Sequence, residues 1–140
     1  MSTEDALQAA LAGEHAVVYG YGVVGARLMG LPDERAAVSG YNTHRARRAT
    51  LELLVAQAGG EPTPAAAGYE LGGPVFTTSQ ARALAARLEH GAAATYCALV
   101  AAATGTTRSA AAGWLVDAAV REAFWSGRPD TFPGLGPGGP

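Results

Sequence analysis

The sequence contains a single cysteine, no basic N-terminal segment and no long uninterrupted apolar run. Cys97 has no partner for an internal disulfide, and the chain opens with acidic residues, so we expect a cytoplasmic location. A bilayer-spanning helix needs roughly 18 or more consecutive apolar residues. Glu, Arg and His interrupt every apolar run, so no membrane association is expected.

The chain also lacks a concentrated field of one charge. Its formal net charge is −2, with acids and bases spread along 140 residues, which excludes the basic surface that attracts nucleic acid. Hydrophobic residues make up 49% of the chain, enough to bury the core of one domain. We expect a helical domain over residues 1–127 and a Gly/Pro-rich tail over 128–140, in which only Phe132 and Leu135 dock.

β-Branched and aromatic residues are sparse and alanine is abundant, so helix is favoured over strand. Apolar positions recur at spacings of three and four, which predicts helices at about 3–29, 34–58, 78–103 and 107–125. The first helix has a continuous inward seam, consisting of Leu7, Leu11, Glu14, Val18, Tyr21, Gly25 and Leu28. Because apolar residues flank Glu14 on this seam, we expect its carboxylate to be buried.

The connection between the second and third predicted helices is unusually long. Residues 59–77 read GGEPTPAAAGYELGGPVFT, which is too rich in Gly and Pro for a regular helix. At about 3.3 Å per residue, this segment can cross the length of a helix of roughly 25 residues. The order of short turn, long connection and short turn predicts an all-α, ferritin-like four-helix bundle with a long crossover connection between helices 2 and 3.

Polar positions match between the two halves of the chain. A Glu-His pair precedes a tyrosine in the first and third helices, at Glu14, His15 and Tyr21 and at Glu89, His90 and Tyr96. The second and fourth helices also match: Tyr41, His44 and Arg48 have the same mutual spacing as Trp114, Asp117 and Arg121. The pattern indicates an internal duplication. His15 and His90 lie about 100° around the helix from the adjacent glutamates, so we expect them at the surface or in an interface.

Four segments, GEHAVVYGYGVVGARL, HRARRATLELL, LAARLEHGAAATYCALVAAA and AAGWLVDAAVREAFW, resemble an uncharacterised ferritin-like domain family of high-GC bacteria. The resemblance covers most of residues 5–135 and implies a ferritin-like fold without an established activity. Di-iron members of the wider superfamily use one Glu from each of two helices and a Glu-x-x-His motif from each of the others. Glu14 and Glu89 match the first pair, whereas the two motifs read Tyr41-x-x-His44 and Trp114-x-x-Asp117.

Most of the di-iron ligand set is therefore missing, and arginines stand beside the remaining acids. We predict an inner ion-pair network in place of the metal centre, formed by Glu14, Tyr41, His44, Arg48, Glu89, Asp117 and Arg121. No cofactor is expected, and the chain is interpreted as a non-catalytic association or small-ligand-binding module. The alternative is a degenerate oxidase or metal-binding protein that holds iron or manganese with Glu14, His44, Glu89 and Asp117. A further alternative places Arg48, Glu89 and Arg121 on seam edges, with their charged groups in water.

The fourth helix carries apolar residues on more than one face, at Trp114, Leu115, Val116, Val120, Phe124 and Trp125. A lone bundle buries one stripe per helix, so this excess predicts a homodimer. The connection over 59–77 or the tail could cover the surface instead.

Overall fold

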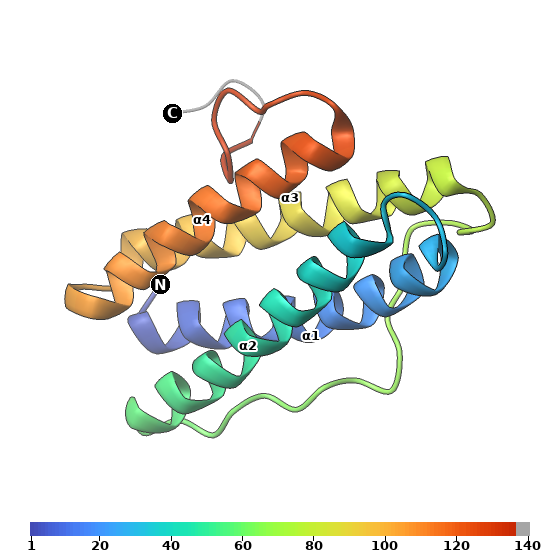
Figure 1. The fold of residues 1–140 in the computed structure, drawn as a ribbon. Coiled ribbons are helices and arrows are strands. Elements are labelled where there is room, and N and C mark those ends of the chain that lie inside the picture. The colour runs from blue at the N-terminus through green and yellow to red at the C-terminus, as the bar shows by residue number, and fades with distance from the viewer. Residues whose placement is uncertain (137–140) are drawn as a thin grey trace.

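The computed structural model describes residues 1–136, which form four helices and no strand. The helices are α1 (Thr3–Leu28), α2 (Glu34–Gln57), α3 (Thr78–Ala102) and α4 (Gly105–Ser126), and Figure 1 shows them as one bundle. The predicted all-α class is confirmed, and the helix boundaries differ from the predicted ones by two residues at most. In this part of the chain, none of the helices has the length and apolar composition needed to cross a bilayer.

Side-chain caps fix two of the helix starts. Ser2 accepts a hydrogen bond from the Asp5 backbone, and Asp5 accepts one from the Ser2 backbone, which closes a capping box on α1. Thr77 forms the same box on α3 with Gln80. Asp33 precedes α2, but its carboxylate makes no capping bond and pairs instead with Arg82 of α3. This ion pair joins the turn between α1 and α2 to the third helix.

The helices pack in the spatial order α2, α1, α3, α4. Extensive packing joins α1 to α2, α1 to α3, and α3 to α4. Between α2 and α4 the link is made by long polar side chains: Arg47 reaches Asp117 at 2.5 Å, and Arg121 reaches Thr43 at 3.0 Å. One side of the bundle is therefore closed by ion pairs and hydrogen bonds rather than by apolar packing.

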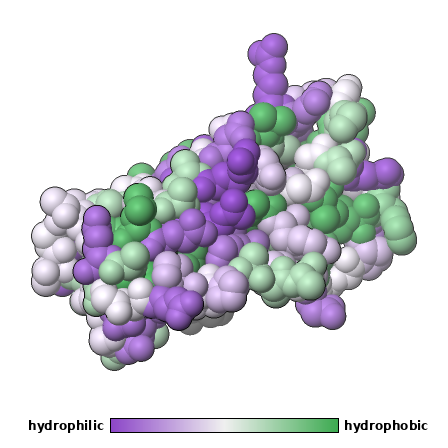
Figure 2. All heavy atoms as spheres, turned by 90° about the horizontal axis from the view of Figure 1, so that it is seen from below, coloured by the Kyte–Doolittle hydropathy of each residue, from purple (hydrophilic) through white to green (hydrophobic). Residues whose placement is uncertain are grey.

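The segment between α2 and α3 passes from one end of the bundle to the other (Figure 1). Gln8 donates to the Glu61 carbonyl at 2.7 Å, His15 contacts the Thr63 carbonyl at 2.8 Å, and Arg87 donates to the Leu71 carbonyl at 3.0 Å. From below, where α2 and this segment lie, the surface mixes hydrophilic and hydrophobic side chains (Figure 2). The surface position predicted for His15 was wrong, because the connection covers this side chain and leaves it only 6% exposed.

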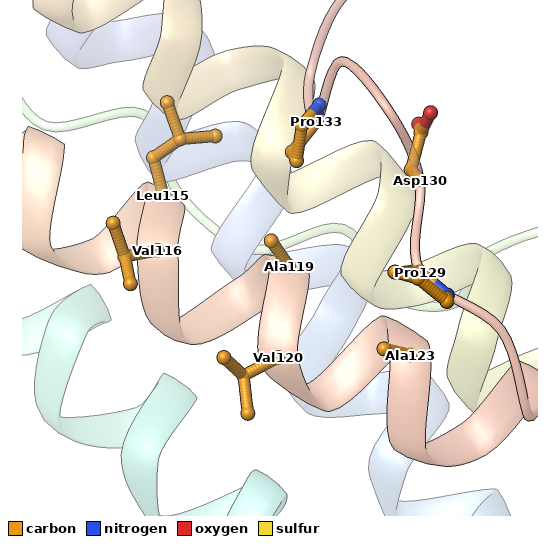
Figure 3. A pocket seen from close by; sticks show the side chains of 8 residues that line it. All are labelled: Leu115, Val116, Ala119, Val120, Ala123, Pro129, Asp130 and Pro133. Carbon is orange, nitrogen blue, oxygen red and sulfur yellow. The ribbon is translucent and has the colours of Figure 1, made fainter.

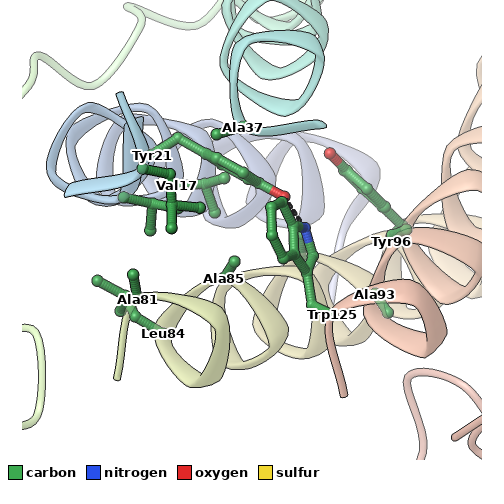
Figure 4. Close-up of a cluster of buried hydrophobic side chains, with 13 residues drawn as sticks. Val17, Tyr21, Ala37, Ala81, Leu84, Ala85, Ala93, Tyr96 and Trp125 are labelled. Carbon is green, nitrogen blue, oxygen red and sulfur yellow. Dashed lines mark hydrogen bonds between the residues drawn. The ribbon is translucent and has the colours of Figure 1, made fainter. Parts of the chain in front are cut away.

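The apolar core consists of two clusters with polar side chains between them along α1 and α2. The first cluster is the larger and contains Val17, Tyr21, Val24, Leu28, Ala37, Ala81, Leu84, Ala85, Ala92, Ala93, Tyr96, Ala118 and Trp125 (Figure 4). The second contains Ala6, Leu7, Ala10, Leu11, Leu51, Val55, Leu99, Ala103 and Ala111. Glu14 lies between the two clusters on α1, and His44 lies between them on α2.

The tail turns back over the bundle after α4. Gly127 adopts a positive φ of 78°, which ends the helix, and Gly134 lies so close to α3 that an added Cβ would be 2.5 Å from the Ala93 carbonyl oxygen. Phe132 and Leu135, the residues predicted to dock, stay 43% and 37% exposed. The backbone at Gly134 makes the close contact, because only a residue without a Cβ fits there. Residues 137–140 of the predicted tail lie outside the described residues.

Candidate functional site

A histidine joins two glutamates in the middle of the bundle. His44 of α2 contacts Glu14 of α1 through Nδ1, at 2.7 Å, and Glu89 of α3 through Nε2, at 3.1 Å. All three side chains are at most 1% exposed. An ionised carboxylate only accepts hydrogen bonds, so both ring nitrogens must donate, and His44 is an imidazolium in this arrangement.

Two tyrosines complete the hydrogen bonding of the glutamates. Tyr21 of α1 donates to Glu89 at 2.5 Å, and Tyr96 of α3 donates to Glu14. Each tyrosine thus donates a hydrogen bond to the glutamate of the other helix. Trp125 of α4 donates from Nε1 to the Tyr21 hydroxyl at 2.9 Å (Figure 4). These bonds join all four helices in one buried polar layer.

The pKa values of this layer follow from burial and from the partners. Burial lowers the pKa of His44, but the hydrogen bonds to Glu14 and Glu89 outweigh it and raise the pKa to about 9. Burial and the charge of Glu89 raise the pKa of Tyr21, and burial and the charge of Glu14 raise that of Tyr96. At neutral pH the histidine is therefore charged and both tyrosines are neutral donors.

An arginine extends the layer toward the surface. Arg47 of α2 donates to the Tyr96 hydroxyl at 3.5 Å and pairs with Asp117 of α4 at 2.5 Å, and Arg121 donates to the same carboxylate at 2.9 Å. Burial raises the pKa of Asp117, but the bonds from Arg121 and Arg47 outweigh it, so the pKa is lowered overall. Asp117 is 37% exposed, so this end of the layer is in contact with water. Across the whole layer, three carboxylates are matched by three cationic side chains.

A glycine determines where Tyr21 lies. A Cβ on Gly40 would be 2.4 Å from the Tyr21 ring, so α2 can pass the ring only because this position carries no side chain. Gly20 similarly leaves room for Leu88, because a Cβ there would be 2.6 Å from the Leu88 side chain. Gly22 and Gly25 face no atom within 4 Å, so they have no such role.

The structure brings some of the predicted site residues together and leaves others apart. Glu14, His44 and Glu89 share the buried centre, while Asp117 and Arg121 form its outer end. Two predicted members lie elsewhere. Tyr41 sits at the edge of the core with Arg45 over its ring, and the place expected for Arg48 is held by Arg47, which is 7% exposed. Positions 47 and 48 lie three and four residues after His44, so both fit a helical seam and the spacing alone could not choose between them.

Sequence reasoning also missed the hydrogen-bonding roles of Tyr21, Tyr96 and Trp125. The available signal was the repeated Glu and Tyr at a spacing of seven, because two turns of helix place both side chains on one face. Two antiparallel helices with this spacing can exchange one hydrogen bond in each direction. Trp125 had no comparable signal, since its partner lies 104 residues away in sequence.

The donor set does not fit a shared metal between Glu14, His44, Glu89 and Asp117. Glu14 and Glu89 bind opposite nitrogens of one imidazole ring, which places that ring between them. Asp117 is paired with Arg47 and Arg121, whose positive charges oppose a nearby cation. The buried oxygens of both glutamates already accept bonds from tyrosine and histidine. The arrangement therefore leaves no place for a metal shared by these four residues.

Comparisons with known proteins identify relatives of this fold. The family model described as "Domain of unknown function (DUF4439)" matches residues 6–137. The chain is also similar to the crystal structure of a conserved hypothetical protein from Mycobacterium tuberculosis, with 34% identity and a TM-score of 0.83 over 89% of this chain and 87% of that one. No functionally curated protein matches the sequence.

Proposed function

We propose that this chain, which belongs to the DUF4439 family, is a non-catalytic helical association module of ferritin-like connectivity in which the buried layer of ion pairs and hydrogen bonds stands in place of a metal centre. The single observation that carries the proposal is the position of His44. It uses both ring nitrogens on Glu14 and Glu89, so the residues that would most readily bind metal already satisfy each other.

The path of the long connection supports the ferritin-like part of the proposal. Its carbonyl groups meet Gln8, His15 and Arg87, which places successive parts of the connection along α1 and then against α3. A long connection of this kind between the second and third helices characterises the ferritin-like order. Glu14 and Glu89 occupy the inner positions on the first and third helices, where the wider superfamily takes carboxylates.

Metal analysis of protein purified without an affinity tag tests the absence of an inner metal. We expect substoichiometric iron and manganese, and an effect of EDTA on the free energy of unfolding that is the same in the parent and in Glu89→Gln. A stabilising metal in the buried layer would instead make the EDTA effect depend on Glu89. One bound iron or manganese per chain that is lost in Glu89→Gln would overturn the proposal.

The exposed side of α4 supports the association role. Val116, Val120 and Phe124 are 66%, 64% and 48% exposed, and the first two line an apolar groove of about 460 Å³ between α4 and the tail (Figure 3). Exposed apolar surface of this kind marks interaction sites in soluble proteins. We propose that a second copy of the chain covers this helix and so forms a homodimer.

Sedimentation equilibrium at micromolar concentration tests the homodimer. We expect a dimer for the parent chain and a monomer for Val116→Glu, because the new charge would be buried in the interface. Leu53→Glu is a matched control, since Leu53 is equally exposed, at 65%, but lies on α2. A monomeric parent, or two variants that dimerise alike, would contradict this interface.

A further inference from the structure

Three side chains that can bind a metal meet at the surface, away from the buried layer. His90 comes from α3, Glu122 from α4 and Asp130 from the tail. His90 Nδ1 lies 3.0 Å from Glu122 Oε1 and 3.9 Å from Asp130 Oδ2, and one ligand atom from each residue lies within 4.8 Å of the others. The spacing of these residues in the sequence does not indicate a site, because they come from three separate elements.

One oxygen of this group lacks a partner. Glu122 Oε2 is buried and accepts no hydrogen bond from residues 1–136, although an ionised carboxylate normally has several acceptor sites filled. The Glu122 side chain is 14% exposed, whereas His90 is 52% exposed. A cation can therefore enter from the solvent at His90 and meet a carboxylate that is already partly desolvated.

The tail holds Asp130 in a defined orientation. Its Oδ1 accepts a hydrogen bond from the Phe132 backbone at 3.2 Å, which leaves Oδ2 facing His90. Gly127 turns the chain back after α4, and Gly134 anchors it against Ala93 of α3. Figure 3 shows Asp130 between Pro129 and Pro133 on this segment. Hydrogen bonds that orient a ligating carboxylate are a regular feature of metal sites.

We propose that His90, Glu122 and Asp130 form a site for a divalent transition metal, of which Zn²⁺ is the representative, that fastens the tail to α3 and α4. One imidazole nitrogen and two carboxylate oxygens form a donor set suited to Zn²⁺. Bonds of about 2.0–2.2 Å in a tetrahedral site place ligand atoms roughly 3.3–3.6 Å apart. The distances from His90 Nδ1 to Glu122 Oε1 and to Asp130 Oδ2, 3.0 Å and 3.9 Å, lie on either side of that range, so small side-chain movements suffice. Water would complete the coordination on the exposed side.

This site is independent of the buried layer. The metal would neutralise two neighbouring carboxylates and supply the missing partner of Glu122 Oε2. It would also link the tail, which lines one wall of the apolar groove through Pro129 and Pro133, to the wall formed by α4. Metal binding would thereby fix the shape of that groove.

Titration calorimetry with ZnCl₂ on the chelator-treated full chain tests the proposal. We expect one Zn²⁺ per chain, with affinity reduced at least tenfold in Asp130→Asn and binding abolished in His90→Ala. Glu70→Gln is a matched control, because Glu70 is an exposed acid in the connection, and it should bind as the parent does. Circular dichroism of each variant verifies that the bundle is folded.

Two results would overturn the site: no Zn²⁺ binding by the folded parent at micromolar concentration, or equal binding by the parent and His90→Ala. Binding that is lost in Glu89→Gln but kept in His90→Ala would place the metal in the buried layer, and would contradict the proposed function as well. Loss of Zn²⁺ binding in His90→Ala but not in Glu89→Gln supports the surface site and leaves the buried layer as proposed.

Discussion

Tyr21 and Tyr96 exchange partners across the bundle: each stands seven residues after a glutamate on its own helix and donates its hydroxyl to the glutamate of the other. His44 then joins the two glutamates. The crossing makes α1 and α3 equivalent in the site. In contrast, α2 contributes His44 to the centre, and the corresponding Asp117 of α4 lies at the rim.

Removal of one tyrosine hydroxyl from the layer should lower the free energy of unfolding. In Tyr96→Phe, Glu14 loses a buried donor, and an unsatisfied buried acceptor costs about 1–3 kcal/mol of unfolding free energy. Tyr41→Phe is the control, because Tyr41 lies outside the layer and should change stability by less than about 0.5 kcal/mol. Urea denaturation at neutral pH measures both. Equal effects would show that the Tyr96 hydroxyl contributes nothing to stability.

Stability should fall as the pH rises from near neutral to alkaline. The folded pKa of His44 is about 9, above its ordinary value of 6.5, so its contribution is complete below pH 6.5 and is lost as the pH passes through 9. A shift of this size corresponds to about 3 kcal/mol. Denaturation curves between pH 6 and 9.5, roughly spanning that window, provide the measurement, with His44→Gln as the reference. If the free energy of unfolding of the parent changed with pH as little as that of His44→Gln, His44 would not be charged in the folded state.

Arg47 and Arg48 offer a test of which arginine belongs to the layer. Arg47→Met removes a charged hydrogen bond to Asp117 and the contact with Tyr96, so we expect a loss of about 1–3 kcal/mol. Arg48→Met removes a half-buried side chain that forms no ion pair within residues 1–136 and should cost less than about 0.5 kcal/mol. Thermal unfolding of the two variants side by side distinguishes them. The reverse order of stability would restore the original prediction for Arg48.

Gly40→Ala should distort the site although alanine favours helix. The added methyl meets the Tyr21 ring at 2.4 Å, and such overpacking costs about 1–3 kcal/mol, more than the gain in helix propensity of up to about 1 kcal/mol. Gly25→Ala is the matched control, because open space surrounds that position and only the propensity gain remains. Stabilisation by both substitutions would mean that Tyr21 moves freely.

Much of the fold could be predicted from periodicity, because the spacing of apolar residues reports which side of a helix is buried. The same spacing could not choose between Arg47 and Arg48, since neighbouring positions on a helix differ by only about 100°. His15 shows a different limit. It was expected at the surface or in an interface because of its angle on α1, but an irregular segment from elsewhere in the chain covers it. The path of such a segment is set by single hydrogen bonds that leave no periodic signal.

The polar layer between the two apolar clusters also fixes the register of the helices along the bundle axis. An all-alanine and leucine interface tolerates sliding, since one small apolar group resembles the next. Displacement of α1 or α3 by one turn, about 5.4 Å, would push glutamates against hydrocarbon and separate both tyrosine pairs at once. A single substitution in the layer therefore leaves a buried partner unsatisfied, whereas replacing several members together by apolar residues avoids that cost.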